Sequence, residues 1–272
     1  MTNLITIQEA VNSFKKLIED SIINGGIEAK EAIIRSSKPI NYIHEAVKSE
    51  LIKAGIEKNR IFPPINASSP EMKLAGFIKQ KYQDVCVAPL IKAPKHEIMH
   101  DGLLQGENDF YGKEYTELVI SINIRSQISS LAKNFDTLYE RTIAEAQNLH
   151  VRCPKMVLGE VYMIAVKEYN PVSMKQNKVE FIDKVGAVEK YIKSFQAING
   201  RKDPTKEDYK YEKVCLLIVD FGQTPAKIYN TNEELIEDGL MYPESKANIV
   251  ALNWESFIPS ILNIYNARNF DK

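Results

Sequence analysis

Apolar residues recur at helical spacing through the first fifty residues of the chain. Spacings of three and four residues predict an amphipathic helix, and they connect six apolar positions: Ile7, Val11, Phe14, Leu17, Ile18 and Ile22. The pair Gly25-Gly26 interrupts the pattern, because glycine is a poor helix former. Further helices are predicted over roughly 27–35 and 42–54, and Gly55 is a typical residue to end the second of them.

The middle of the chain alternates short apolar runs with longer amphipathic segments. Apolar and β-branched runs predict strands over 84–88, 116–124, 156–166 and 214–220. Amphipathic segments predict helices over 126–150, 185–198, 232–239 and 255–267. A further helix is predicted over 70–81, since Ser69 can cap it, Pro70 suits its first turn and Glu71 favours its positive end. The polar stretch 94–112 is predicted to be a long loop.

This order of elements predicts an α/β (α+β) fold with a mixed central sheet flanked by helices. The continuous apolar character of 156–166 suits a strand that is buried on both faces of such a sheet. With no repeat and no linker, we expect a single domain over 1–272. Within it we expect a helical N-terminal layer over 1–60, an α/β core over 68–225 and closing helices over 226–272.

Composition and charge are ordinary for a globular protein. Of the 272 residues, 44% are hydrophobic and 26% are charged, which is enough to bury a full core. With 35 basic and 36 acidic residues the net charge is −1, so the chain has no bulk attraction to nucleic acid, although Lys and Arg can still gather on one face. Three widely spaced cysteines beside apolar runs are typical of buried thiols in a reducing compartment.

The sequence also indicates where the protein is found and what it does not bind. The N-terminal segment has neither the apolar block nor the cleavage site of a signal peptide, and no window is apolar enough to cross a membrane, so we expect a cytoplasmic protein without a membrane partner. Phosphate-binding glycine motifs are absent, so we expect no nucleotide cofactor. His96 and His100 have a metal-like spacing, but they lie in the predicted loop and are interpreted as solvated side chains.

The acidic residues are the best candidates for chemistry. Glu71 and Glu145 fall on the apolar stripes of their predicted helices, where a carboxylate is costly unless it binds a metal or a cation. Asp84 lies at the start of a predicted strand, directly after a segment that contains Lys79 and Lys81. Glu117 opens the next strand, and the residues that share its face by period two are Ser121, Asn123 and Arg125.

These residues also have ordinary structural explanations. Glu71 can simply favour a helix start, and Asp84 can end a turn. Glu145 can simply pair with Arg141 or Arg125, and Arg125 can be a buried structural partner. What favours a function is that acids and cations fall on consecutive elements around one predicted sheet, because carboxylates hold Mg²⁺ and nearby Lys or Arg stabilises charge on an attacked phosphate.

Two stretches carry a resemblance to a known family. The first is SSPEMKLAGFIKQKYQDVCVAP at 68–89, and the second is ISINIRSQISSLAKNFDTLYERTIAEAQNL at 120–149, which is followed by the strand in MVLGEVYMIAV. Both resemble parts of type II restriction endonucleases of the PD-(D/E)XK superfamily. Ser121, Arg125-Ser126 and the Glu-Ala-x-Asn-Leu run at 145–149 are similar to the branch that cuts CCGG-type sites. The resemblance covers roughly 70–165, about a third of the chain.

The resemblance implies an enzyme that uses Mg²⁺ to hydrolyse double-stranded DNA at a short palindromic site, within a restriction-modification system and as a homodimer. It implies metal ligation by Asp84, Glu145 and Glu71, and the catalytic set is Glu71, Lys81, Asp84, Glu117, Arg125 and Glu145. The family places a lysine six residues before the arginine, where this chain has Val119, so Lys79, Lys81 or Lys113 would have to take that role. DNA contact is expected from the loop 94–113 and from a set that begins at the end of the second strand: Arg125, Ser126, Gln127, Lys133 and Asn134.

Two other functions fit the sequence. One is a non-catalytic interaction module of a phage-defence or toxin system, which the missing lysine at Val119 favours. The other is a metal-dependent hydrolase of a smaller phosphate ester, which would need a deep pocket in place of a DNA-wide cleft.

Overall fold

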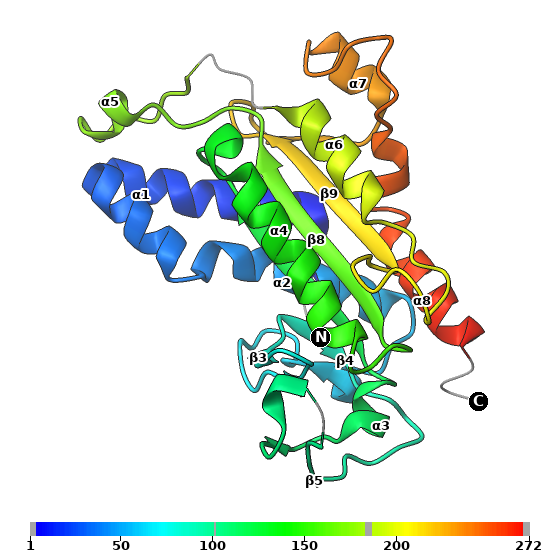
Figure 1. Cartoon of the computed structure of the whole chain (residues 1–272). Helices are drawn as coiled ribbons and strands as arrows, with labels where there is room; N and C mark the ends of the chain where they lie inside the picture. Colours follow the sequence, from blue (N-terminus) through cyan, green and yellow to red (C-terminus); the bar gives the residue numbers. More distant parts are fainter. Residues whose placement is uncertain (1–3, 101, 183–186, 269–272) are drawn as a thin grey trace.

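A six-stranded sheet forms the centre of the computed structural model, which describes residues 4–100, 102–182 and 187–268 (Figure 1). The strand order is β1-β4-β7-β8-β9-β10. The three long strands β7 (Ile120–Gln127), β8 (Val157–Ala165) and β9 (Lys213–Asp220) run parallel to one another. The outer strands pair antiparallel: β1 (Ile61–Phe62) with β4 (Val85–Val87), β4 with β7, and β10 (Lys227–Tyr229) with β9. The predicted mixed sheet is therefore confirmed.

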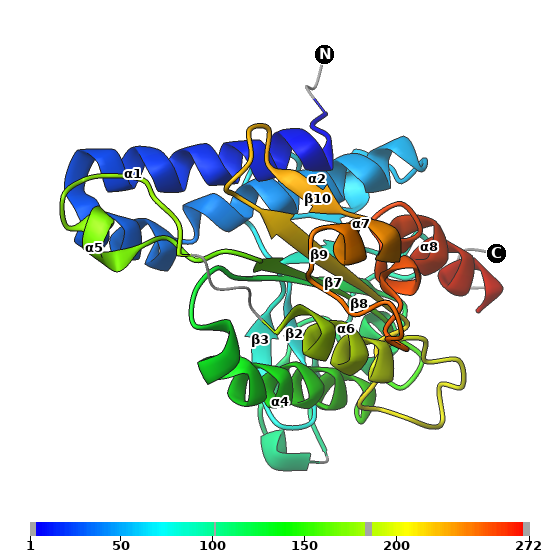
Figure 2. The same ribbon diagram turned by 90° about the horizontal axis from the view of Figure 1, so that it is seen from above.

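Helices cover both faces of this sheet (Figure 2). One face packs against α1 (Ile7–Arg35), α2 (Lys38–Lys53) and α8 (Phe257–Ala267), and the other against α4 (Leu131–His150) and α6 (Val188–Ala197). All nine residues of β8 are buried, as its continuous apolar run predicts. Gly159 lets α8 approach closely, since a Cβ at this position would lie 2.8 Å from Cζ of Phe257.

The N-terminal helical layer is confirmed. Thr6 and Glu9 form a capping box at the start of α1, and Gly25 and Gly26 leave helical geometry within it, as the sequence predicts. Gly26 has a positive φ of 62°, and a Cβ there would lie 2.6 Å from the carbonyl oxygen of Met174 in α5 (Pro171–Met174). The helix predicted over 42–54 is α2, and it begins four residues earlier than expected, at Lys38.

The predicted helix over 70–81 is wrong. This segment forms an antiparallel hairpin of β2 (Lys73–Ala75) and β3 (Gln80–Tyr82) instead. The reason is tertiary. Backbone N–H groups of the hairpin turn donate to the side chain of Asn148, which is about seventy residues away, and no local pattern reports that contact.

The remaining elements follow the predictions with shifted bounds. The predicted loop 94–112 contains a small hairpin of β5 (Glu97–Ile98) and β6 (Asn108–Asp109), and the short helix α3 (Lys113–Thr116) follows it. Because α3 occupies the start of the predicted strand, β7 begins only at Ile120, and α4 begins five residues later than expected. The predicted helix over 185–198 is α6, and its first two predicted positions lie outside the described residues. The closing region contains α7 (Asn232–Glu237) and α8 as predicted, but it also supplies β10 to the sheet.

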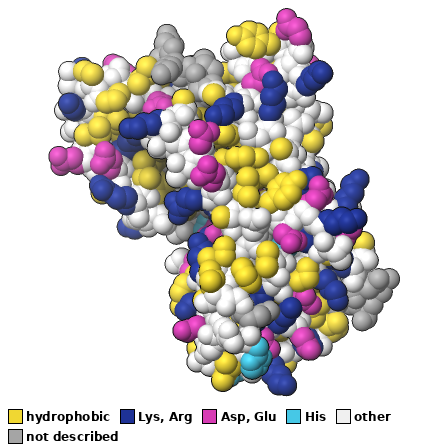
Figure 3. Space-filling model, viewed as in Figure 1, with side chains coloured by type: hydrophobic (Ala, Val, Ile, Leu, Met, Phe, Trp, Pro, Cys, Tyr) yellow, Lys and Arg dark blue, Asp and Glu magenta, His cyan; other side chains and the backbone are white. Residues whose placement is uncertain are grey.

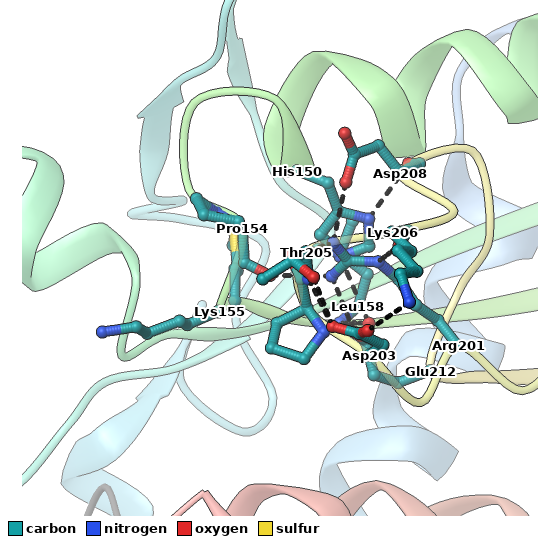
Figure 4. Close-up of polar contacts among 12 residues, drawn as sticks. His150, Pro154, Lys155, Leu158, Arg201, Asp203, Thr205, Lys206, Asp208 and Glu212 are labelled. Carbon is teal, nitrogen blue, oxygen red and sulfur yellow. Dashed lines mark hydrogen bonds and ion pairs between the residues drawn. The ribbon is translucent and has the colours of Figure 1, made fainter.

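A buried polar cluster fixes the start of β8 (Figure 4). The Glu212 carboxylate accepts hydrogen bonds from Leu158 N at 2.8 Å, Arg201 Nη1 at 3.2 Å and Arg268 Nη2 at 2.8 Å, and His150 Nε2 lies 3.2 Å from it. Arg201 also donates to carbonyl groups of the 200–210 loop. The ion pairs of Glu212 and its hydrogen bond from Leu158 N connect the loop, α4 and α8 to β8. This network fixes the position of the start of β8.

Three short 3-10 turns complete the described elements, at Lys58–Arg60, Gly102–Leu104 and Ile249–Leu252. None of the helices in the described part of the chain is sufficiently long and apolar to cross a bilayer.

Candidate functional site

Three polar residues lie side by side across adjacent strands of the sheet. The antiparallel register of β4 and β7 pairs Val85 with Ile122 and therefore places Asp84 opposite Asn123. The parallel register of β7 and β8 pairs Asn123 with Glu160. Two strand spacings are about 10 Å, so Asp84 and Glu160 flank one narrow site. The Oδ2 atom of Asp84 accepts a hydrogen bond of 2.7 Å from Ile124 N, which fixes the carboxylate at the end of its strand.

Arg125 joins this site from the next position on the same face of β7. Its Nη1 donates to Thr142 Oγ1 at 2.7 Å and lies 3.5 Å from Glu160 Oε1, and its Nη2 lies 3.9 Å from Glu145 Oε2. Burial alone would lower the pKa of the guanidinium, but the charges of Glu160 and Glu145 outweigh burial and raise it. Arg125 is thus a fixed cation between two carboxylates.

Glu145 enters the site from α4 and is 5% exposed. Its Oε2 lies 3.1 Å from Nζ of Lys81 and 3.9 Å from Nζ of Lys79, and both lysines belong to the β2–β3 hairpin. The other carboxylate oxygen, Oε1, is buried and has no hydrogen-bond partner among the described residues. The inward-facing carboxylate that the apolar stripe indicates is therefore confirmed, and cations surround it.

Glu160 is a site residue that the sequence analysis missed. Its side chain is fully buried in β8, and neither carboxylate oxygen has a hydrogen-bond partner in the described part of the chain. Burial raises the pKa of Glu160 to about 7, against the opposing charge of Arg125. A single acid within the apolar run Val157–Ala165 was the available signal, because an isolated carboxylate inside a buried strand is costly.

Asn148 holds the hairpin turn that carries Lys79. It lies three residues after Glu145 on α4, and its Oδ1 accepts hydrogen bonds from Ile78 N at 2.8 Å and Lys79 N at 3.0 Å. Its Nδ2 donates to Lys79 O at 3.2 Å, and its carbonyl oxygen accepts from Phe77 N at 2.7 Å. Gly76 permits this close seat, since a Cβ there would lie 2.3 Å from Nδ2 of Asn148.

A cavity of about 390 Å³ opens beside these residues. Its walls come from the start of α2, the end of β7, α4 and the hairpin, and its charged lining residues are Lys79, Lys81, Arg125, Arg141 and Glu145. Four cations and one carboxylate make the cavity suited to an anion such as a phosphate. Asp84 and Glu160 do not line it, but both lie close enough to Arg125 for their charges to raise its pKa.

The other predicted catalytic residues lie elsewhere. Glu71 precedes β2, not on a helix, and lines a separate pocket with His44 and Lys48. Burial and the charge of Asp84 raise the pKa of Glu71. Glu117 is the C-terminal cap residue of α3 and does not line the 390 Å³ cavity, and Val119 is a buried core residue.

The residues predicted to contact DNA divide into two groups. Ser126 is exposed and lines the cavity, and Lys133 and Asn134 are exposed in the first turn of α4. Gln127 is buried: its amide donates to Ser130 O, and its Oε1 accepts from the hydroxyls of Tyr162 and Tyr191. These bonds occupy the amide of Gln127 inside the protein.

No group of three or more His, Cys, Asp or Glu side chains within the described ranges is close enough to hold a metal by itself. The predicted ligands Asp84, Glu145 and Glu71 thus do not form such a group in this structure. Comparison with known proteins found no matching family model, no matching curated protein and no matching solved structure.

Proposed function

We propose that this protein is a Mg²⁺-dependent endonuclease for double-stranded DNA, of the type II restriction class. The observation that carries the proposal is the meeting of Asp84, Glu145 and Glu160 with Arg125 and the two hairpin lysines beside an anion-sized cavity. The resemblance over 70–165 supports the same class, because this stretch supplies every acidic and basic side chain of the site. A homodimer that matches a palindromic site is part of the proposal.

The donor atoms of the site fit a magnesium ion when the substrate contributes ligands. Mg²⁺ prefers oxygen and is often held by one or two carboxylates together with waters and substrate phosphates. Both oxygens of Glu160 are buried without a hydrogen-bond partner among the described residues, and Asp84 lies two strands away in register. Asp84 and Glu160 would hold the ion, and when bound the ion supplies an activated water and a Lewis acid for the phosphate.

The chain's own side chains would do the rest. Arg125 is held by Thr142 and two carboxylates, so it presents its charge to a phosphate without reorganisation. Lys81, 33% exposed, is the nearest hairpin amine to Glu145. It would take the role of the lysine that the family has where this chain has Val119, and would stabilise charge on the phosphate. Arg141, one turn before Glu145 on α4, also lines the cavity and would add a further positive charge there.

The test is incubation of the purified protein with phage DNA and Mg²⁺, for the wild type and for Asp84→Asn. We expect discrete fragments from the wild type, none in EDTA, and a loss of at least about a hundredfold in rate for the variant. The matched control is Asp136→Asn, an 81% exposed acid on α4 that should leave cleavage unchanged. Absence of cleavage across metals and salt concentrations would refute the proposal, as would equal rates for the wild type and Asp84→Asn.

A further inference from the structure

The β2–β3 hairpin has a charge pattern unlike that of the whole chain. Residues 72–83 contain Lys73, Lys79 and Lys81 and no acidic residue, whereas the chain as a whole carries a net charge of −1. We propose that this hairpin is the DNA-docking element of the protein and grips the duplex beside the cavity. The proposal rests on the proposed function, and it concerns a segment for which local sequence signals predict a helix.

Apolar side chains are exposed beside these lysines. Phe77 is 38% exposed and Ile78 is 45% exposed at the turn, and Tyr82 is 56% exposed on the second strand. Nζ of Lys73 lies 5.9 Å from the centre of the Tyr82 ring. In Figure 3 the lower lobe, which contains the hairpin, shows apolar side chains next to Lys and Arg side chains. Cations interleaved with exposed apolar rings are typical of surfaces that bind nucleic acid.

The hairpin directs two of its three lysines, Lys79 and Lys81, towards the cavity. Leu74 pairs with Lys81 in the hairpin register, and Leu74 is buried, so this face of the hairpin looks inward and brings Lys81 to Glu145. Lys79 is 57% exposed and also lines the cavity. A DNA phosphate in the cavity would therefore lie at the edge of the hairpin. The adjacent phosphates of the same DNA strand would then contact Lys79 and the hairpin turn.

The turn is rigidly mounted. The four backbone contacts to Asn148 fix residues 77–79 on α4, so little ordering is needed when DNA binds. The chemistry of the surface selects the partner: ammonium groups contact backbone phosphates, and the apolar tip of Phe77 and Ile78 contacts sugars and base edges at a groove.

The experiment measures binding alone. Fluorescence anisotropy of a labelled duplex is recorded in EDTA, where no cleavage occurs, over a series of salt concentrations. For Lys79→Gln we expect the slope of log K against log salt to fall by about 1, which corresponds to about eightfold weaker binding at 0.1 M salt. For Phe77→Ser we expect about fivefold weaker binding or more with the slope unchanged.

Two further variants separate docking from folding. Asn148→Ala keeps every charge and the bond from Phe77 N to the backbone carbonyl but removes the three side-chain hydrogen bonds to the turn, so it should weaken binding several-fold. Gln147→Ala, at an exposed neighbour on α4, should not. Lys206→Gln is the charge control, since Lys206 is 75% exposed in the 200–210 loop and is paired with an acid as Lys79 is. Thermal unfolding of each variant confirms that it is folded.

Each outcome decides between the two proposals. If the wild type binds duplex and Lys79→Gln and Phe77→Ser bind equally well, the hairpin proposal is overturned and the proposed function stands. If the wild type binds no duplex at any salt concentration, both are overturned. Weaker binding by these variants, with Lys206→Gln unchanged, supports the hairpin as the docking element.

Discussion

Replacing Glu212 by Gln tests whether the buried cluster at the start of β8 stabilises the fold. The carboxylate faces Arg201, Arg268, His150 and Leu158 N within 3.2 Å, and its side chain is fully buried. A glutamine of the same shape turns one acceptor oxygen into an amide donor, so it places N–H against N–H. It also removes the carboxylate that faces Arg268 and leaves Arg201 with Asp208 as its remaining acidic partner among the described residues. Breaking a buried pair in this way costs about 3–5 kcal/mol.

The assay is thermal unfolding followed by circular dichroism. For a chain of this size 1 kcal/mol corresponds to roughly 2–4 °C in Tm, so we expect Glu212→Gln to lower Tm by roughly 6–20 °C. The matched control is Glu207→Gln, in which an acid that is 41% exposed in the same loop loses its pairing with Lys210. Its effect should be below about 1 kcal/mol.

The pH dependence gives a second readout. Burial alone would raise the pKa of Glu212, but the hydrogen bond and charge of His150 and the charge of Arg268 outweigh it, so the pKa is lowered below 4.5. The stabilisation is therefore complete above pH 4.5 and is lost as the pH falls through the lower folded value. The gap in Tm between wild type and Glu212→Gln should close in that acidic range. A gap that is absent at neutral pH, or that stays constant into acid, would refute the reasoning.

Two further predictions concern packing and hydrogen bonding in the core. Gln127→Ala should destabilise the fold by about 1–3 kcal/mol, because the buried hydroxyl of Tyr162 loses its acceptor and that of Tyr191 keeps only Leu131 O. Duplex affinity in EDTA should stay within about twofold; weaker DNA binding by a stably folded variant would instead identify Gln127 as a DNA contact. Gly159→Ala should lower the free energy of unfolding in urea by about 1–3 kcal/mol, since the added Cβ would lie 2.8 Å from Phe257. Adding Phe257→Leu to this variant should recover part of the lost stability. If the losses of the two single variants simply add in the double variant, the steric explanation is wrong.

The sheet and its long helices follow from local patterns. Period-two and continuous apolar runs identify β7, β8 and β9, and the apolar stripe of α4 reports both the helix and the inward-facing Glu145. These local patterns predict the elements correctly because each long helix or strand buries its own apolar residues within the core around one sheet.

The site depends on contacts that no local pattern reports. The β2–β3 hairpin forms where the sequence favours a helix start, because Asn148 satisfies its turn from a distant helix. Glu160 is hidden in an apolar run whose partners become known only once the strand register is set. The polar side chain of Gln127 likewise suggests a DNA contact, but the hydroxyls of Tyr162 and Tyr191 donate hydrogen bonds to it inside the protein.

One turn of α4 sets the geometry on which the proposed chemistry depends. Glu145 and Asn148 are three residues apart, so a rise of about 4.5 Å along a rigid helix fixes the distance between the carboxylate and the backbone that carries Lys79. The polypeptide between β4 and β7, with its small β5–β6 hairpin, supplies neither the acid nor the lysine, but it braces the β2–β3 hairpin: Leu103 N donates to Phe77 O at 3.3 Å, and the side-chain amide of Gln80 donates to Asn108 O at 2.8 Å. Insertions or deletions in this segment that keep those two hydrogen bonds would change the surface offered to a partner without altering the spacing of acid and lysine, so specificity can diverge there.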